Sequence, residues 1–186
     1  MLKYLTNFGV YMEITGFRNC KIGAAEDFLK ITHMKPHRVT VQFFDAETVA
    51  TWQHLYFAVV NALTAFKNKT TISENIAVEI LLYASAQRQI RKAIKQMGIK
   101  HESENIAAVI VGENPDDVKT ALLAVANHVN AEPDESVLAL SAAKMKRIME
   151  AFGISELELE AVAKDDVQQA LVDLVIERVA LLATQI

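Results

Sequence analysis

One short stretch of this 186-residue chain concentrates positive charge. Between Ala84 and His101 the sequence has no acidic residue and five cations: Arg88, Arg91, Lys92, Lys95 and Lys100. The whole chain has a formal charge of −4, so these five positive charges leave −9 on the remainder. Lysine and arginine can bind phosphate groups, but a general nucleic-acid binder is basic over most of its surface. The pattern therefore predicts one local anionic partner.

The same stretch predicts an amphipathic helix from about Gln87, which Gly98 ends as a left-handed C-cap. At 100° per residue the cations and the apolar residues fall on opposite sides. The basic side has Arg88, Arg91, Lys92 and Lys95, and the apolar side has Ile90, Ala93, Ile94 and Met97. A solvated surface of an ordinary helix explains the basic side. A ligand-binding surface explains it too, since no Glu or Asp at i,i+4 offsets the like charges.

Three residues outside this helix could extend the basic surface. Lys67 and Lys69 lie in the loop before the predicted helix pair and would add positive charge. Tyr83 lies at the end of the preceding helix, where its ring could stack on a base of single-stranded RNA. A core tyrosine with a satisfied hydroxyl explains Tyr83 equally well.

The elements that must hold this surface include a small sheet. Short runs rich in β-branched or aromatic residues predict strands at Val10 to Thr15, Arg38 to Phe44 and Ile106 to Val111, with Val137 to Leu140 as a fourth. Apolar residues at helical spacing predict about seven helices around it. We therefore expect a helix-rich α/β (α+β) fold of about four strands and seven helices, in a single domain over 1–186.

Capping residues predict where several helices start. Asp45 is read as the N-cap of a long helix to about Phe66, and Thr71 with Glu74 as a capping box. The other predicted helices are Ala24 to Thr32, Asn114-Pro115 to about Val129, Ala142 to Phe152 before Gly153, and a segment from the Ser155/Glu158 capping box to the C-terminus, broken near Lys164 to Asp166.

The C-terminal helix, about 167–183, is apolar over most of its circumference and places Arg178 among leucines and valines. A charge there is costly unless it is paired. Arg178 therefore either meets a carboxylate within the chain or reaches an acidic group of a partner. The helix packs on its own domain or on that partner.

Several classes of protein lack support in the sequence. No phosphate-binding loop, dinucleotide fingerprint, nucleophile elbow or kinase signature is present, and no base accompanies Ser85, so we expect no enzyme and no cofactor. Pro36 between His33 and His37 argues against a metal site on one helix. With a lone Cys20 and no long apolar run, we expect a soluble, cytoplasmic protein without a membrane partner.

Short segments spread over nearly the whole chain occur in an order and spacing typical of one family. They are Ile14-Thr15-Gly16, Phe43-Phe44-Asp45-Ala46, Asn75 to Tyr83, Ser85 with Arg88-Gln89-Ile90, Ala93-Ile94, Gly98-Ile99 and Glu177 to Leu182. Through them the chain resembles the Cgi-type, TPRKB-like family, the small accessory subunit of the KEOPS (EKC) complex. One departure is Ala86, where the family pattern leads us to expect glycine.

The resemblance implies a regulatory, non-catalytic role in tRNA processing. KEOPS carries out threonylcarbamoyladenosine synthesis, a tRNA modification, and other subunits hold its active sites. The small subunit of the family binds the atypical kinase/ATPase subunit and the single-stranded 3′ CCA end of tRNA, and meets the other KEOPS subunits indirectly. An alternative reading is a protein-only interaction module that activates the kinase without contacting RNA.

Carried onto this sequence, the resemblance assigns tRNA binding to Asn75, Arg88 and Gln89. The charge argument adds Lys69, Tyr83, Arg91, Lys92 and Lys95 to that surface. The kinase interface is expected at Arg178, Leu181 and Leu182, and the long helix after Asp45 is a second candidate for it. No catalytic or metal-binding residue is predicted.

Overall fold

The computed structural model describes residues 2–20, 38–163 and 165–185. These residues form two compact units, each made from two separate stretches of chain. The first unit comprises Met1–Ala46 with Ile99–Val137, and the second comprises Glu47–Gly98 with Leu138–Ile186. The predicted helix at Ala24 to Thr32 and the pair His33 and His37 lie outside the described residues. The single domain over 1–186 stays a prediction.

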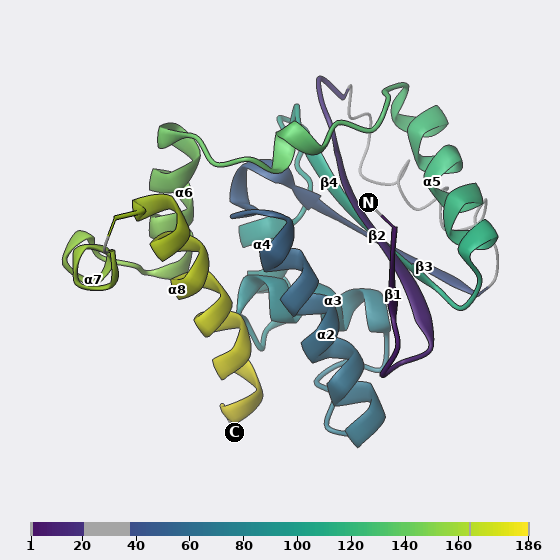
Figure 1. Cartoon of the computed structure of the whole chain (residues 1–186), viewed down its shortest axis with the longest axis horizontal. Helices are drawn as coiled ribbons and strands as arrows, with labels where there is room; N and C mark the ends of the chain where they lie inside the picture. Colours follow the sequence, from purple (N-terminus) through teal and green to yellow (C-terminus); the bar gives the residue numbers. More distant parts are fainter. Residues whose placement is uncertain (1, 21–37, 164, 186) are drawn as a thin grey trace. The chain divides into compact units, whose positions relative to one another are not determined.

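The first unit is built on a four-stranded antiparallel sheet in the order β1-β2-β4-β3. Its strands are β1 Leu2–Leu5, β2 Val10–Phe17, β3 Val39–Asp45 and β4 Ile106–Gly112. The central strand β4 is buried along its whole length, as its uninterrupted apolar sequence IAAVIVG requires. Helix α5 (Pro115–Val129) packs on one side of the sheet (Figure 1). There Ile106, Ala108 and Ile110 meet Val118, Ala121 and Val125 of the helix.

The strand predictions at β2, β3 and β4 are confirmed, but the fourth strand was predicted in the wrong place. The edge strand is β1, which pairs with β2 from Leu2↔Glu13 to Leu5↔Val10. Most of the predicted strand Val137 to Leu140 lies in or beside a 3-10 helix, η2 (Glu135–Leu138). The Asp134 carboxylate accepts a hydrogen bond from the Ser136 N–H at 2.9 Å, and this local turn competes with strand formation.

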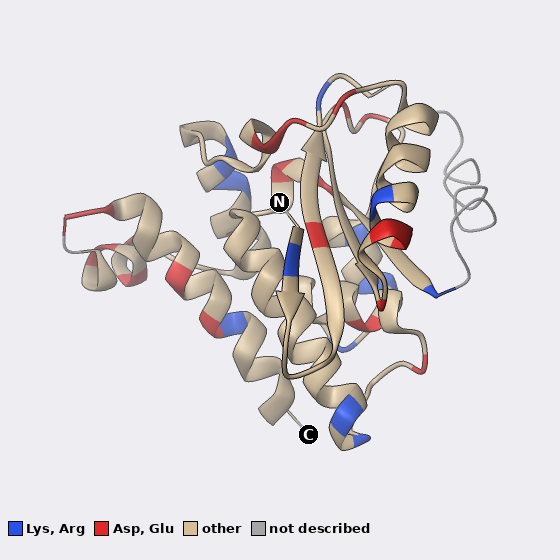
Figure 2. Cartoon of the chain, turned by 45° about the vertical axis from the view of Figure 1, so that its right-hand side comes forward, with Lys and Arg blue, Asp and Glu red and all other residues tan. Residues whose placement is uncertain are grey.

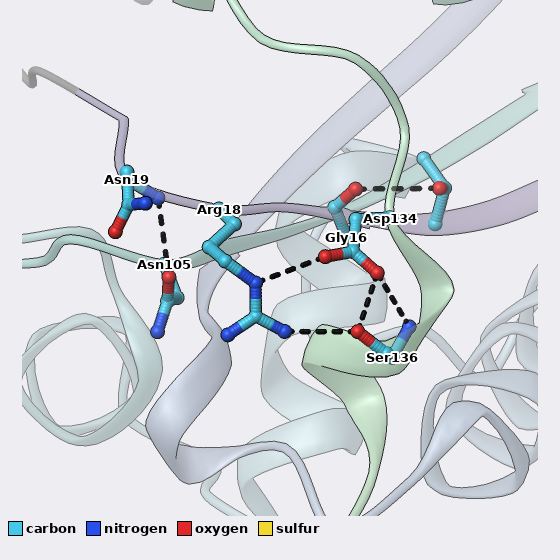
Figure 3. Close-up of polar contacts among 7 residues, drawn as sticks. Gly16, Arg18, Asn19, Asn105, Asp134 and Ser136 are labelled. Carbon is cyan, nitrogen blue, oxygen red and sulfur yellow. Dashed lines mark hydrogen bonds and ion pairs between the residues drawn. The ribbon is translucent and has the colours of Figure 1, made fainter.

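A polar cluster fixes η2 against the end of β2 (Figure 3). The Arg18 guanidinium lies 3.0 Å from the Asp134 carboxylate and donates to the Ser136 hydroxyl at 2.8 Å. Hydrogen bonds from Ser136 and from Arg18 hold the pKa of Asp134 below its usual value. The Asp134 N–H donates to the Gly16 carbonyl at 2.8 Å. A Cβ at Gly16 would lie 2.8 Å from Val137 Cβ and 2.9 Å from the Asp134 carbonyl oxygen, so this approach requires glycine.

The second unit is helical. Its α-helices among the described residues are α2 Trp52–Asn68, α3 Ile76–Ser85, α4 Ile90–Met97, α6 Ala142–Phe152, α7 Glu156–Val162 and α8 Val167–Leu181. With α5 they make seven described α-helices, and the helix-rich α+β prediction is confirmed. Helix α8 packs against α2, α3, α6 and α7, and it buries apolar residues on several sides as its sequence predicts.

Several predicted helix ends are confirmed. Asn114 caps α5 with Pro115 at the first position, and the Ser155 hydroxyl accepts from the Glu158 N–H at 3.1 Å. Gly153 ends α6 with φ +63. The break before α8 is also present, where the Asp166 side chain caps the helix.

Three predicted caps are wrong. Asp45 ends β3 and its carboxylate accepts from the buried Ser103 hydroxyl at 2.9 Å; the long helix α2 has Thr51 as its N-cap, so Asp45 does not cap it. Asn75, rather than Thr71 with Glu74, caps α3, because its amide oxygen reaches the N–H groups of two first-turn residues. Gly98 has φ −67 and ends α4 in an extended conformation instead of a left-handed one.

Candidate functional site

The predicted basic surface belongs to the second unit, on the turn between α3 and α4 and on α4 itself. Helix α3 is held at its start by the Asn75 side chain, which accepts from Ala77 N at 2.9 Å and Val78 N at 3.4 Å. A short turn joins it to α4, and Gln96 of α4 donates to the Ser85 carbonyl at the end of α3 at 3.2 Å. The Ser85 hydroxyl donates to the Leu81 and Leu82 carbonyls, so it satisfies backbone acceptors in the last turn of α3. Side-chain hydrogen bonds therefore stabilise both the start of α3 and its junction with the basic helix α4.

The cations of α4 are free for a ligand. Arg91, Lys92 and Lys95 are exposed, and none of them forms an ion pair with another residue that the structure describes. Gln89 is exposed at the N-cap of α4 without a side-chain capping bond. Arg88 is exposed as well, but it lies before the helix and donates to the Gln185 backbone carbonyl. Arg91, Lys92, Lys95 and Gln89 thus form the unpaired part of the predicted surface.

The side of α4 opposite the cations is less buried than the helical wheel predicts. Ala93 and Met97 are fully buried, but Ile90 is 45% exposed and Ile94 is 51% exposed. Ile90 and Ile94 lie on one face because they are four residues apart. An exposed apolar strip therefore borders the basic side, and the helical period alone did not predict that these isoleucines are exposed.

Tyr83 is part of the core rather than of this surface. Its side chain is only 3% exposed, and burial, with the nearby Glu79 carboxylate, raises its pKa. The ring is therefore not presented for stacking on a base. Lys69 is exposed but caps the C-terminus of α2 in a left-handed conformation, on a different element from α4.

Glu79 is a buried carboxylate that sequence reasoning missed. It is 0% exposed and accepts hydrogen bonds from the backbone of the loop before α3, from Ile72 N at 3.1 Å and Ser73 N at 2.7 Å. These bonds replace the water that a carboxylate normally needs. Glu79 therefore holds the loop that leads into the Asn75 cap. The sequence did offer one sign that Glu79 is buried, because apolar residues flank it in the segment NIAVEILLY.

The second predicted surface is the C-terminal part of α8. Arg178 pairs with Glu158 of α7 at 2.5 Å, which settles the choice between an internal and an external carboxylate in favour of the internal one. Leu182 is fully buried, whereas Leu181 is 42% exposed. Of the three predicted interface residues, only Leu181 presents a large apolar side chain to solvent.

We also searched the described residues for a metal site, a membrane-spanning helix and a reactive cysteine. They contain no group of three or more side chains able to hold a metal ion, and none of their helices is long and apolar enough to cross a membrane. Cys20 is buried, which raises its thiol pKa to about 11 and leaves it a poor nucleophile. The candidate site is an exposed basic and apolar surface on α4.

Comparisons with known proteins agree on the family. The family model described as "Kinase binding protein CGI-121" matches residues 24–183. The "Regulatory protein Cgi121" of Methanocaldococcus jannaschii is 33% identical over 113 residues, which cover 61% of this chain and 70% of that protein. Because the family match extends over well more than half of the sequence, this chain belongs to the CGI-121 family of kinase binding proteins.

Proposed function

We propose that this chain is a non-catalytic regulatory subunit of the KEOPS complex, which binds the atypical kinase/ATPase subunit and the 3′ CCA end of tRNA. The family membership supports the kinase partner and the regulatory role. The proposal has an RNA half, binding of tRNA, and a kinase half, binding of the kinase subunit. The observation that supports the RNA half is the unpaired basic side of α4, on a chain that is acidic overall. Its role is to recruit tRNA for threonylcarbamoyladenosine synthesis by other subunits.

The RNA half rests on Arg91, Lys92 and Lys95 as phosphate contacts. Their side chains need break no internal ion pair to bind RNA, so that cost does not reduce the affinity. Ile90 and Ile94 give an apolar strip beside them on which an unpaired base can lie. Asn75 and Tyr83 contribute indirectly, by capping α3 and by filling the core beneath the turn.

A mobility-shift titration tests this half with the intact chain. Arg91→Glu with Lys95→Glu should weaken binding of tRNA at least tenfold and lower the salt slope by about 1.4, for two lost single-strand phosphate contacts. The matched control is Arg38→Glu with Lys119→Glu, which makes the same change of charge at exposed residues of the first unit. Removing the CCA end of tRNA should mimic the α4 variant. Equal effects of both double variants would contradict the assignment.

The kinase half rests on the C-terminal part of α8. Leu181 offers exposed apolar area, and Arg178 with Glu158 gives a half-buried ion pair beside it that orders the helix. Leu181→Glu should abolish capture of the kinase subunit in a pull-down while leaving tRNA binding unchanged. If the isolated chain shows no tRNA shift but still captures the kinase, the protein-only module is the correct function.

A further inference from the structure

A groove in the second unit is lined by other residues than the two surfaces discussed above. It is formed by α6, α7 and the first residue of α8, and its volume is about 940 Å³. Its apolar lining includes Met145, Met149, Ile154 and Leu159. No residue of α4 lines it. Leu181 is fourteen residues beyond Val167, the α8 residue in the groove, which is about 20 Å along a helix.

The rim of the groove is acidic. Glu150, Glu156 and Glu160 line it, and Lys146 is the one cation among the lining residues. All four are exposed. Figure 2 shows acidic positions on α7 and in the connection to α8. An apolar floor with an acidic rim is complementary to a helix that is apolar on one side and basic at its edges.

The floor suits a helical occupant for a second reason. Met145 and Met149 are four residues apart on α6 and half-buried, so their flexible side chains can adapt to the knobs of an inserted helix.

We propose that this groove binds a positively charged amphipathic helix of a partner protein. The apolar side of that helix lies on Met145, Met149 and Leu159. Its flanking lysines or arginines meet Glu150, Glu156 and Glu160. The residues that line the groove include none of those assigned to the basic side of α4, and none of Arg178, Leu181 and Leu182.

A synthetic peptide probes the groove directly. The probe is an 18-residue fluorescein-labelled peptide with leucine at i, i+3, i+4 and i+7 and lysine elsewhere, and its reference is the same composition in scrambled order. Fluorescence anisotropy with the full chain should show binding of the amphipathic peptide at least tenfold tighter than of the scrambled one. Equal binding would mean that only net charge matters and would overturn the proposal.

Two variants with the same charge change locate the contact. Glu156→Lys with Glu160→Lys should weaken the peptide at least tenfold, whereas Glu102→Lys with Glu132→Lys, both exposed in the first unit, should change it less than twofold. Similar losses in the two variants would overturn the proposal. Met149→Glu should abolish binding, provided that circular dichroism shows a folded protein.

Oxidative footprinting gives a readout that does not depend on any variant. Saturating peptide should protect Met145 and Met149 from hydroxyl radicals, with the buried Met12 and Met97 as internal references. Binding without protection would place the peptide elsewhere and overturn the proposal. So would a concentration-dependent dimer in sedimentation that Met149→Glu disrupts, because a second copy would then occupy the groove.

Discussion

The Arg88 guanidinium donates a hydrogen bond to the backbone carbonyl of Gln185. Arg88 lies in the turn before α4, and Gln185 follows the short 3-10 helix η3 (Leu182–Thr184) at the end of α8. This bond joins the two surfaces of the proposed function, the basic helix and the C-terminal segment. Arg88 therefore differs from Arg91, Lys92 and Lys95, which are free to contact RNA.

Arg88→Ala should loosen the C-terminal segment without unfolding the protein. Because the side chain is exposed, we expect a loss of less than about 1 kcal/mol in the free energy of unfolding. Amide hydrogen exchange of residues 182–185 should become faster, and capture of the kinase should weaken. Arg91→Ala is the control and should reduce tRNA binding alone. Unchanged exchange in Arg88→Ala would show that the bond does not order this segment.

Ala86→Gly should stabilise the protein. Ala86 ends α3 with φ +50, a left-handed conformation in which its Cβ costs about 1–2 kcal/mol. Glycine removes this strain but loses more backbone entropy on folding, so the net gain should be about 0.5–1 kcal/mol. Urea unfolding monitored by circular dichroism measures the difference.

The control for Ala86→Gly is the same substitution inside a helix. Ala161→Gly, on the exposed side of α7, should lower the free energy of unfolding by about 0.5–1 kcal/mol. A loss of stability in both variants would mean that the turn at Ala86 is not strained.

The fold was predictable where one local signal dominates. The apolar run of β4 and the Asn114-Pro115 start of α5 were predicted within a residue of their ends, because no competing interaction acts on them. Asp45 was misread because a carboxylate before a helical pattern indicates an N-cap, whereas its actual partner, Ser103, is 58 residues away. Such long-range hydrogen bonds leave no local trace in the sequence.

The candidate site was predictable in its charges but not in its burial. The cations of α4 are exposed as the helical wheel places them, and the internal pairing of Arg178 was one of two predicted outcomes. Tyr83 and Leu182 are buried, and Ile90 and Ile94 are exposed, because burial depends on neighbours that the period of one helix does not specify. The left-handed conformation of Ala86 was not predicted although the family pattern has glycine there, because alanine by itself favours the helical conformation.

Gly16→Ala should destabilise the first unit. The added Cβ would lie 2.9 Å from the Asp134 carbonyl oxygen, and that backbone is held by its own hydrogen bond to Gly16. We expect a loss of about 1–3 kcal/mol in the free energy of unfolding, as for other overpacked positions. Differential scanning calorimetry measures it. Arg18→Ala, which removes an exposed ion pair to Asp134 and an exposed hydrogen bond to Ser136, should cost less than about 1 kcal/mol.

His54 should make the stability of the protein depend on pH. The ring is fully buried, accepts from Ala50 N at Nδ1 and donates through Nε2 to the Ala84 carbonyl at 2.7 Å, so it is neutral in the folded protein. Burial lowers its pKa from 6.5 to about 4, and the positive charge of Lys144 acts in the same direction.

The sign of the effect follows from the direction of this shift. Since the folded pKa of His54 lies below its unfolded value, its contribution is fully present above pH 6.5 and is lost as the pH falls toward 4. The loss should reach about 2 kcal/mol at pH 5. Urea unfolding at pH 7.5, 6 and 5 should show this extra loss in the native chain but not in His54→Gln, whose amide can still donate to Ala84. A His54 ring that titrates near 6.5 by NMR in the folded protein would contradict the prediction, because an accessible ring contributes no such dependence.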